Sequence, residues 1–166
     1  ISKLNYVMND ALELQFGVDW RTAGIEHARE VRDLLGGDYF INMADDNYPN
    51  GRIRKLGDII AYHNETTVDW LGFYAQGSYT QGPINAYGMI GQSSISYSYQ
   101  DHFTINDKKI EADAIGAVQV KGGLMYTMSD NMSIYGNYGV VEKPPIMDNV
   151  IYYDGTVASD PMNETF

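Results

Sequence analysis

The side chains of this chain that could do chemistry alternate with apolar ones. Glu13, Asp19 and Arg21 are separated by even spacings in the stretch LELQFGVDWR, and Lys121 takes the same kind of position in VQVKGGLMYTM. Successive side chains of an extended strand point to opposite faces, so these charges would share one face of their strands. We expect them mainly to hydrogen-bond neighbouring segments, with direct contact to a polar ligand as a second role.

His27 and Arg29 have the same parity as Arg21 and lie in the stretch IEHAREVRDLLGG. Two structures fit this stretch. Apolar residues at helical spacing, followed by two glycines, would form a short helix. A strand that continues to Arg29 would instead place His27 and Arg29 on the polar face, where they could bind a ligand at the mouth of a pore.

Other residues of chemical interest form no recognisable site. The oxygen-rich stretch MADDNYPNGR lacks the spacing and the closing Glu of an EF-hand, so a polar turn is expected there. The three histidines are too widely spaced for a zinc site, there is no cysteine, and no motif of a hydrolase, metalloprotease or nucleotide-binding loop is present. We therefore expect no metal, no cofactor and no enzymatic activity.

The alternation predicts at least five long antiparallel strands. Each has about 9–11 residues or slightly more, the length that crosses a bilayer at a tilt, whereas strands of soluble proteins average about 5–6 residues. The expected strands cover residues 12–21, 68–79, 86–99, 117–128 and 132–141. The apolar face of the first would carry Leu12 to Trp20, and that of the third Tyr87, Met89, Ile95, Tyr97 and Tyr99.

Connections between these strands alternate between short and long. VMNDA, TQGPI and MSDNM are short and rich in turn-forming residues, whereas residues 22–67 and 100–116 form long loops. Membrane barrels have short turns on one side and long loops on the other. With the long loops outside, Trp20, Tyr97 and Tyr99 would lie at the outer boundary of the membrane, and Tyr79, Tyr87 and Tyr126 at the inner one.

Composition limits the function classes. The formal charge of −11 argues against a nucleic-acid partner, and no apolar run is long enough for a transmembrane helix. The chain does not begin with Met, so we expect it to be an internal piece of a longer protein. A soluble β-sandwich that binds a ligand such as a carbohydrate is the alternative, because soluble antiparallel sheets also alternate.

Three stretches carry a family resemblance. The segments LQFGVDWRTAGIEH and VQVKGGLMYTMSDNMSIYGNYG, with the exit VVEKPP, resemble the barrel of TonB-dependent outer-membrane receptors. Strands of that family leave the membrane near an Arg-x-Pro, and Lys143 and Pro145 stand at those positions here. The resemblance covers most of residues 1–166, which would form part of a single transmembrane barrel domain.

The resemblance implies an all-β fold, with about five to six strands of a 22-stranded barrel and long extracellular loops. It implies energy-coupled uptake of a scarce nutrient such as a siderophore, a vitamin or a glycan, across the bacterial outer membrane. The partners would be membrane lipid, the remaining strands, a plug domain not found in this sequence, the inner-membrane TonB complex and the nutrient. A porin or adhesin barrel that does not use TonB remains a further alternative.

Overall fold

A computed structural model describes residues 1–103, 107–152 and 154–166. Within these residues one antiparallel sheet has the order β1-β2-β5-β6-β8-β9-β10, with β7 paired to β6. Its strands are β1 (Ser2–Asn9), β2 (Leu12–Glu30), β5 (Ile59–Gln81), β6 (Ile84–Asp101), β7 (Lys109–Glu111), β8 (Ile115–Ser129), β9 (Met132–Lys143) and β10 (Glu164–Thr165). A separate hairpin joins β3 (Phe40–Asn42) to β4 (Arg52–Arg54), and η1 (Met147–Asn149) is a short 3-10 turn.

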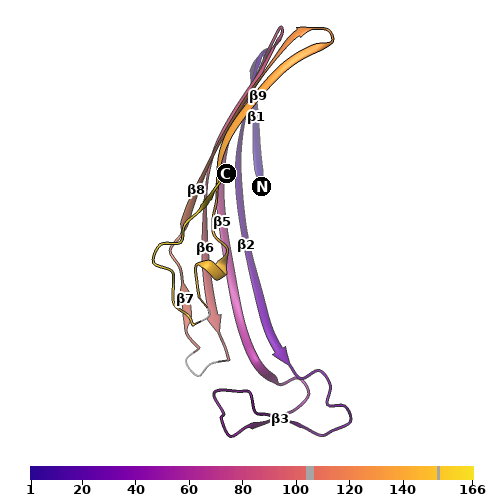
Figure 1. The fold of residues 1–166 in the computed structure, drawn as a ribbon, viewed down its shortest axis with the longest axis vertical. Coiled ribbons are helices and arrows are strands. Elements are labelled where there is room, and N and C mark those ends of the chain that lie inside the picture. The colour runs from indigo at the N-terminus through magenta and orange to yellow at the C-terminus, as the bar shows by residue number, and fades with distance from the viewer. Residues whose placement is uncertain (104–106, 153) are drawn as a thin grey trace.

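The connections divide between the two ends of the sheet, as the sequence predicts. Residues 10–11, 82–83 and 130–131 make tight turns at one end. Residues 31–58 and 102–114 make long connections at the other, which is the lower end in Figure 1. A third long connection, residues 144–163, lies at that same end and was not expected from the sequence. Residues 104–106 of the second connection lie outside the described residues.

Several strands continue far beyond the lengths expected from the alternation. β2 ends at Glu30 instead of residue 21, and β5 begins at Ile59 instead of residue 68. The pairs from Thr22↔Asp69 to Ala28↔His63 form one uninterrupted ladder between them. The short helix considered for residues 25–35 is therefore wrong, and the alternative of a continuing strand is confirmed. No helix of the described residues is long and apolar enough to span a membrane.

Cross-strand pairs define two faces of the sheet, because directly paired residues point to the same side. One apolar row runs Leu4, Phe16, Ala75, Ile90, Val120 and Val140 across six strands. This apolar face is exposed, with Trp20 at 73% and Ile90 at 62%. The described part of the chain has no second sheet over it of the kind that a β-sandwich requires.

The prediction that the tyrosines of the third expected strand, now β6, lie on its apolar face is wrong. Tyr87 pairs with Ser78 and Gly123, and Tyr97 pairs with Val68, so the tyrosines of β6 share the polar face. The turn between β5 and β6 decides this. Gly82 has φ +54°, and the two-residue turn pairs Gln81 with Ile84, so that Ala86 and Ile90 fall on the apolar face. Of the aromatic residues expected at the membrane boundaries, Trp20, Tyr79 and Tyr126 remain on the apolar face.

A small core lies on the polar face at the end with the long connections. Tyr97, Val150 and Ile151 are buried together, with Val68, Ile95 and Met147 packed around them. The Tyr97 hydroxyl donates a hydrogen bond of 2.9 Å to the carbonyl oxygen of Pro145. The described part of the third connection is thus fixed against the polar face and not against the apolar one.

Candidate functional site

Asp19 and Arg21 lie side by side on the polar face of β2. Arg21 Nε donates a hydrogen bond of 2.9 Å to Asp19 Oδ1, and a second nitrogen of the guanidinium contacts the other carboxylate oxygen. The alternation of the strand explains the pair, since residues two apart point to the same side. Each of the two charges is therefore paired. Together the side chains present hydrogen-bond donors and acceptors to the space in front of the polar face.

Other residues predicted for the site are spread along the same face. Lys121 pairs with Met89, four residues from the level of Asp19 towards the end with the tight turns. His27 pairs with Asn64 three rows beyond Arg21, and Arg29 lies at an irregularity in the β2–β5 ladder. Among the described residues, the ion pairs within 4.0 Å include Asp19 with Arg21 but none with His27, Arg29 or Lys121. The five residues therefore do not form one constellation.

Long side chains on the polar face lie flat across glycines of neighbouring strands. The Tyr74 ring occupies the space in which a Cβ of Gly17 would stand, and Tyr87 does the same over Gly123. Tyr74 Oη donates a 2.8 Å hydrogen bond to Gln15 Oε1. The Gln15 amide in turn donates to Asn5 Oδ1, also at 2.8 Å. This network joins β5, β2 and β1.

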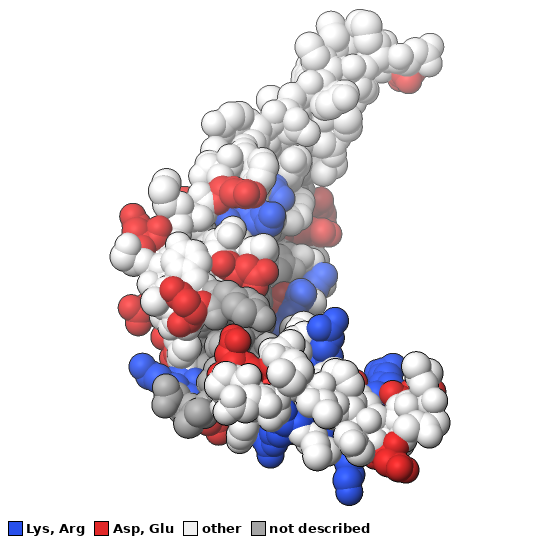
Figure 2. Space-filling view, turned by 60° about the horizontal axis from the view of Figure 1, so that its bottom comes forward, with Lys and Arg blue, Asp and Glu red and all other residues white. Residues whose placement is uncertain are grey.

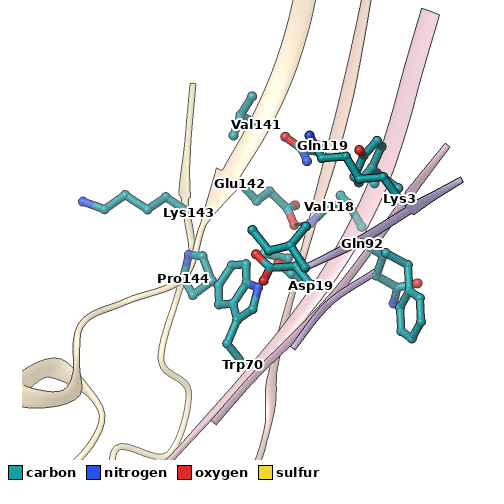
Figure 3. Close-up of a pocket in the computed structure, with 17 residues that line it drawn as sticks. Lys3, Asp19, Trp70, Gln92, Val118, Gln119, Val141, Glu142, Lys143 and Pro144 are labelled. Atoms are coloured by element: carbon teal, nitrogen blue, oxygen red, sulfur yellow. Dashed lines mark hydrogen bonds between the residues drawn. The ribbon is translucent and has the colours of Figure 1, made fainter. Parts of the chain in front are cut away.

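A cavity of about 420 Å³ opens on the polar face near the outer end of the predicted membrane span (Figure 3). Its lining comes from both edges of the sheet, including Lys3 of β1 and Val141 of β9. Asp19 and Trp70 lie on its floor between these edges. The sheet is therefore curved enough across its strands to form a trough on this side.

On the face shown in Figure 2, charged side chains gather on the rim at the end with the long connections, and the part with the tight turns is almost free of them. Asp45 there forms a buried ion pair with Arg54, 3.1 Å between Oδ2 and a terminal guanidinium nitrogen. The Asn47 amide donates a 2.9 Å hydrogen bond to the carbonyl oxygen of Phe103. The expected polar turn is thus a fixed part of the rim that links two long connections.

Sequence reasoning missed one association at the rim. His63 and His102, 39 positions apart, have ring centroids 4.9 Å from each other, and His63 Nε2 lies 2.7 Å from Glu26 Oε1. The β5–β6 pairing brings the two histidines together, since Asn64 pairs with Asp101. Pairing by the two-residue turn at residues 82–83 could have indicated this. Within the described ranges, no three His, Cys, Asp or Glu side chains are arranged to hold a metal ion.

A loop carboxylate in the third connection has a perturbed pKa. Hydrogen bonds from the Thr156 hydroxyl and backbone N–H hold the pKa of the exposed Asp154 below its ordinary value. Asp154 and Thr156 form a local turn motif of the Asx type. This interaction orders the connection and does not bring Asp154 to the cavity.

Comparison with known proteins identifies the family of the chain. No curated protein and no solved structure matches the chain. A family model described as "TonB dependent receptor-like, beta-barrel" matches residues 3–164. That family consists of receptors and transporters of the bacterial outer membrane, and its barrel strands account for the bare apolar face and the alternating connections. The chain belongs to the TonB-dependent receptor-like β-barrel family.

Proposed function

We propose that this chain forms part of the wall of an outer-membrane receptor that imports a scarce nutrient with energy from the inner membrane. One observation carries the proposal: the apolar row crosses six neighbouring strands, no other described segment covers it, and the chain belongs to this family. Exposed apolar strands are stable in lipid when every backbone group is paired within a sheet. Membrane lipid is thus the proposed neighbour of the apolar face.

The polar face is proposed to line the lumen and to contact the plug domain and the passing nutrient. Asp19 and Arg21 are already paired with each other, and Lys121 lies over Gly139, which supports a mainly structural role for all three. His27 and Arg29 lie beyond the level of Trp20 and would stand at the mouth, where a nutrient arrives first. We also propose that residues 1–166 are part of a single transmembrane barrel domain, to which other strands of the full-length protein contribute.

Growth and fractionation test the proposal in the bacterium that carries the gene. The protein should sediment with the outer membrane and require detergent for extraction. Strains that lack the gene or the inner-membrane coupling protein should share a growth defect on one of three limiting nutrients: chelated iron, cobalamin or an oligosaccharide. Extraction without detergent, or a defect that does not depend on the coupling protein, would contradict the proposal.

A further inference from the structure

The cavity on the polar face has a lining that points to a class of ligand. Its charged residues are two cations and two anions, Lys3 and Lys143 against Asp19 and Glu142. This local balance contrasts with the formal charge of −11 of the whole chain. A site for a charged ligand presents an excess of the opposite charge, and this cavity presents none.

Three of the four charges also have partners within the chain. Asp19 accepts from Arg21, and the Glu142 carboxylate accepts a 2.9 Å hydrogen bond from the backbone N–H of Val118. Lys143 lies 3.5 Å from a carboxylate oxygen of Glu164. Groups satisfied in this way can still donate or accept further hydrogen bonds, because carboxylates and ammonium groups have several positions to offer.

Aromatic and amide groups complete the floor of the cavity. The Trp70 indole lies along its own strand, with Nε1 3.2 Å from where a Cβ of Gly72 would stand. Gln119 lies across Gly91 in the same manner, its amide nitrogen 2.8 Å from the corresponding position. Figure 3 shows Trp70 beside Asp19 and facing Pro144. The result is an apolar surface surrounded by hydrogen-bonding groups.

We propose that this cavity binds a neutral, hydroxyl-rich ligand of the saccharide class on the lumen wall. A sugar ring has an apolar C–H face that would stack on the Trp70 indole, while its hydroxyl groups hydrogen-bond to Asp19 and Gln119. A volume of about 420 Å³ accommodates one to two sugar units. The inference deepens the proposed function, because the ligand reaches this wall only if the polar face lines the lumen of a receptor.

Binding to the purified full-length receptor in detergent tests the inference. The probes are neutral malto-, xylo- and galacto-oligosaccharides, with oligogalacturonate as the acidic comparison, and calorimetry measures the affinity. Trp70→Ala should weaken binding of the preferred neutral oligosaccharide about tenfold or more, and Trp70→Phe should retain affinity within about threefold. Trp20→Phe is the matched control on the lipid-facing side, and it should leave affinity unchanged.

Gln119→Ala provides a second variant in case Trp70→Ala does not assemble, and it should weaken binding about fivefold. The inference fails if the wild-type receptor binds none of the neutral probes or prefers the acidic one. It also fails if Trp70→Ala, or Gln119→Ala in its place, binds as tightly as the control. Binding in detergent needs no coupling energy, so this failure would leave a receptor with coupling-dependent growth intact and would be distinct from failure of the proposed function.

Discussion

A charge placed on β6 tests which of its two faces meets lipid. Ile90 lies on the apolar row and Met89, its neighbour in the chain, pairs with Lys121 on the polar face. Ten residues separate Ser94, at the level of Trp20, from Ile84 at the turn. With a rise of about 3.3 Å per residue and a tilt of about 40°, this stretch spans roughly 25 Å, and Ile90 lies about 10 Å from its outer edge.

Ile90→Arg therefore places a cation close to the bilayer midplane. The expected loss of stability is about 2–4 kcal/mol, which corresponds to a roughly 30- to 900-fold change in the folding equilibrium. Met89→Arg, which places the same charge toward the lumen, should cost less than about 1 kcal/mol. Urea unfolding of the full-length protein from lipid vesicles measures both. A larger loss for Met89→Arg than for Ile90→Arg would refute the assignment of the two faces.

Three further substitutions test packing. Gly17→Ala would put a Cβ into the space that the Tyr74 ring occupies and should cost about 1–3 kcal/mol in urea unfolding, part of which Tyr74→Ala should restore. Asp45→Ala leaves Arg54 buried without its partner, which should lower the free energy of unfolding by roughly 3–5 kcal/mol and speed proteolysis of residues 31–58. Adding Arg54→Met to this variant removes the unpaired charge and should slow proteolysis again. Tyr97→Phe keeps the packing and removes one buried hydrogen bond, so amide hydrogen exchange in residues 147–152 should become faster by an amount that corresponds to about 1 kcal/mol. Unchanged exchange would contradict the role of the Tyr97 hydroxyl in anchoring the third connection.

The strand pattern was largely predictable because hydrophobic alternation and turn chemistry are local. The stretch Leu12 to Trp20 has one apolar parity, and the short connections contain the residues that tight turns require. The faces of β6 were not predicted from its own sequence, because small residues occupy both parities and its tyrosines suggested a membrane boundary. Counting back from the turn at Gly82 would have settled its register.

Contacts between distant segments were beyond the reach of sequence patterns. The association of His63 with His102 depends on strand pairing. The burial of Tyr97 against Val150 and Ile151 depends on the path of the third connection. The residues that line the cavity come from both edges of the sheet. They are brought together by the curvature of the sheet and belong to no sequence motif. Asp19 and Arg21 were predicted to share one face of their strand, and their two-residue spacing explains why the structure shows them paired.

The length of β5 has a mechanical consequence for how the receptor meets its surroundings. About 12 residues separate Leu71, at the edge of the apolar band, from the start of the strand at Ile59. That stretch rises roughly 30 Å above the lipid and is paired with β2 as far as Ile59, but with β6 only as far as Asn64. Residues 31–58 begin only at the top of this stretch, so molecules in the medium would touch that connection before they reach the headgroup layer.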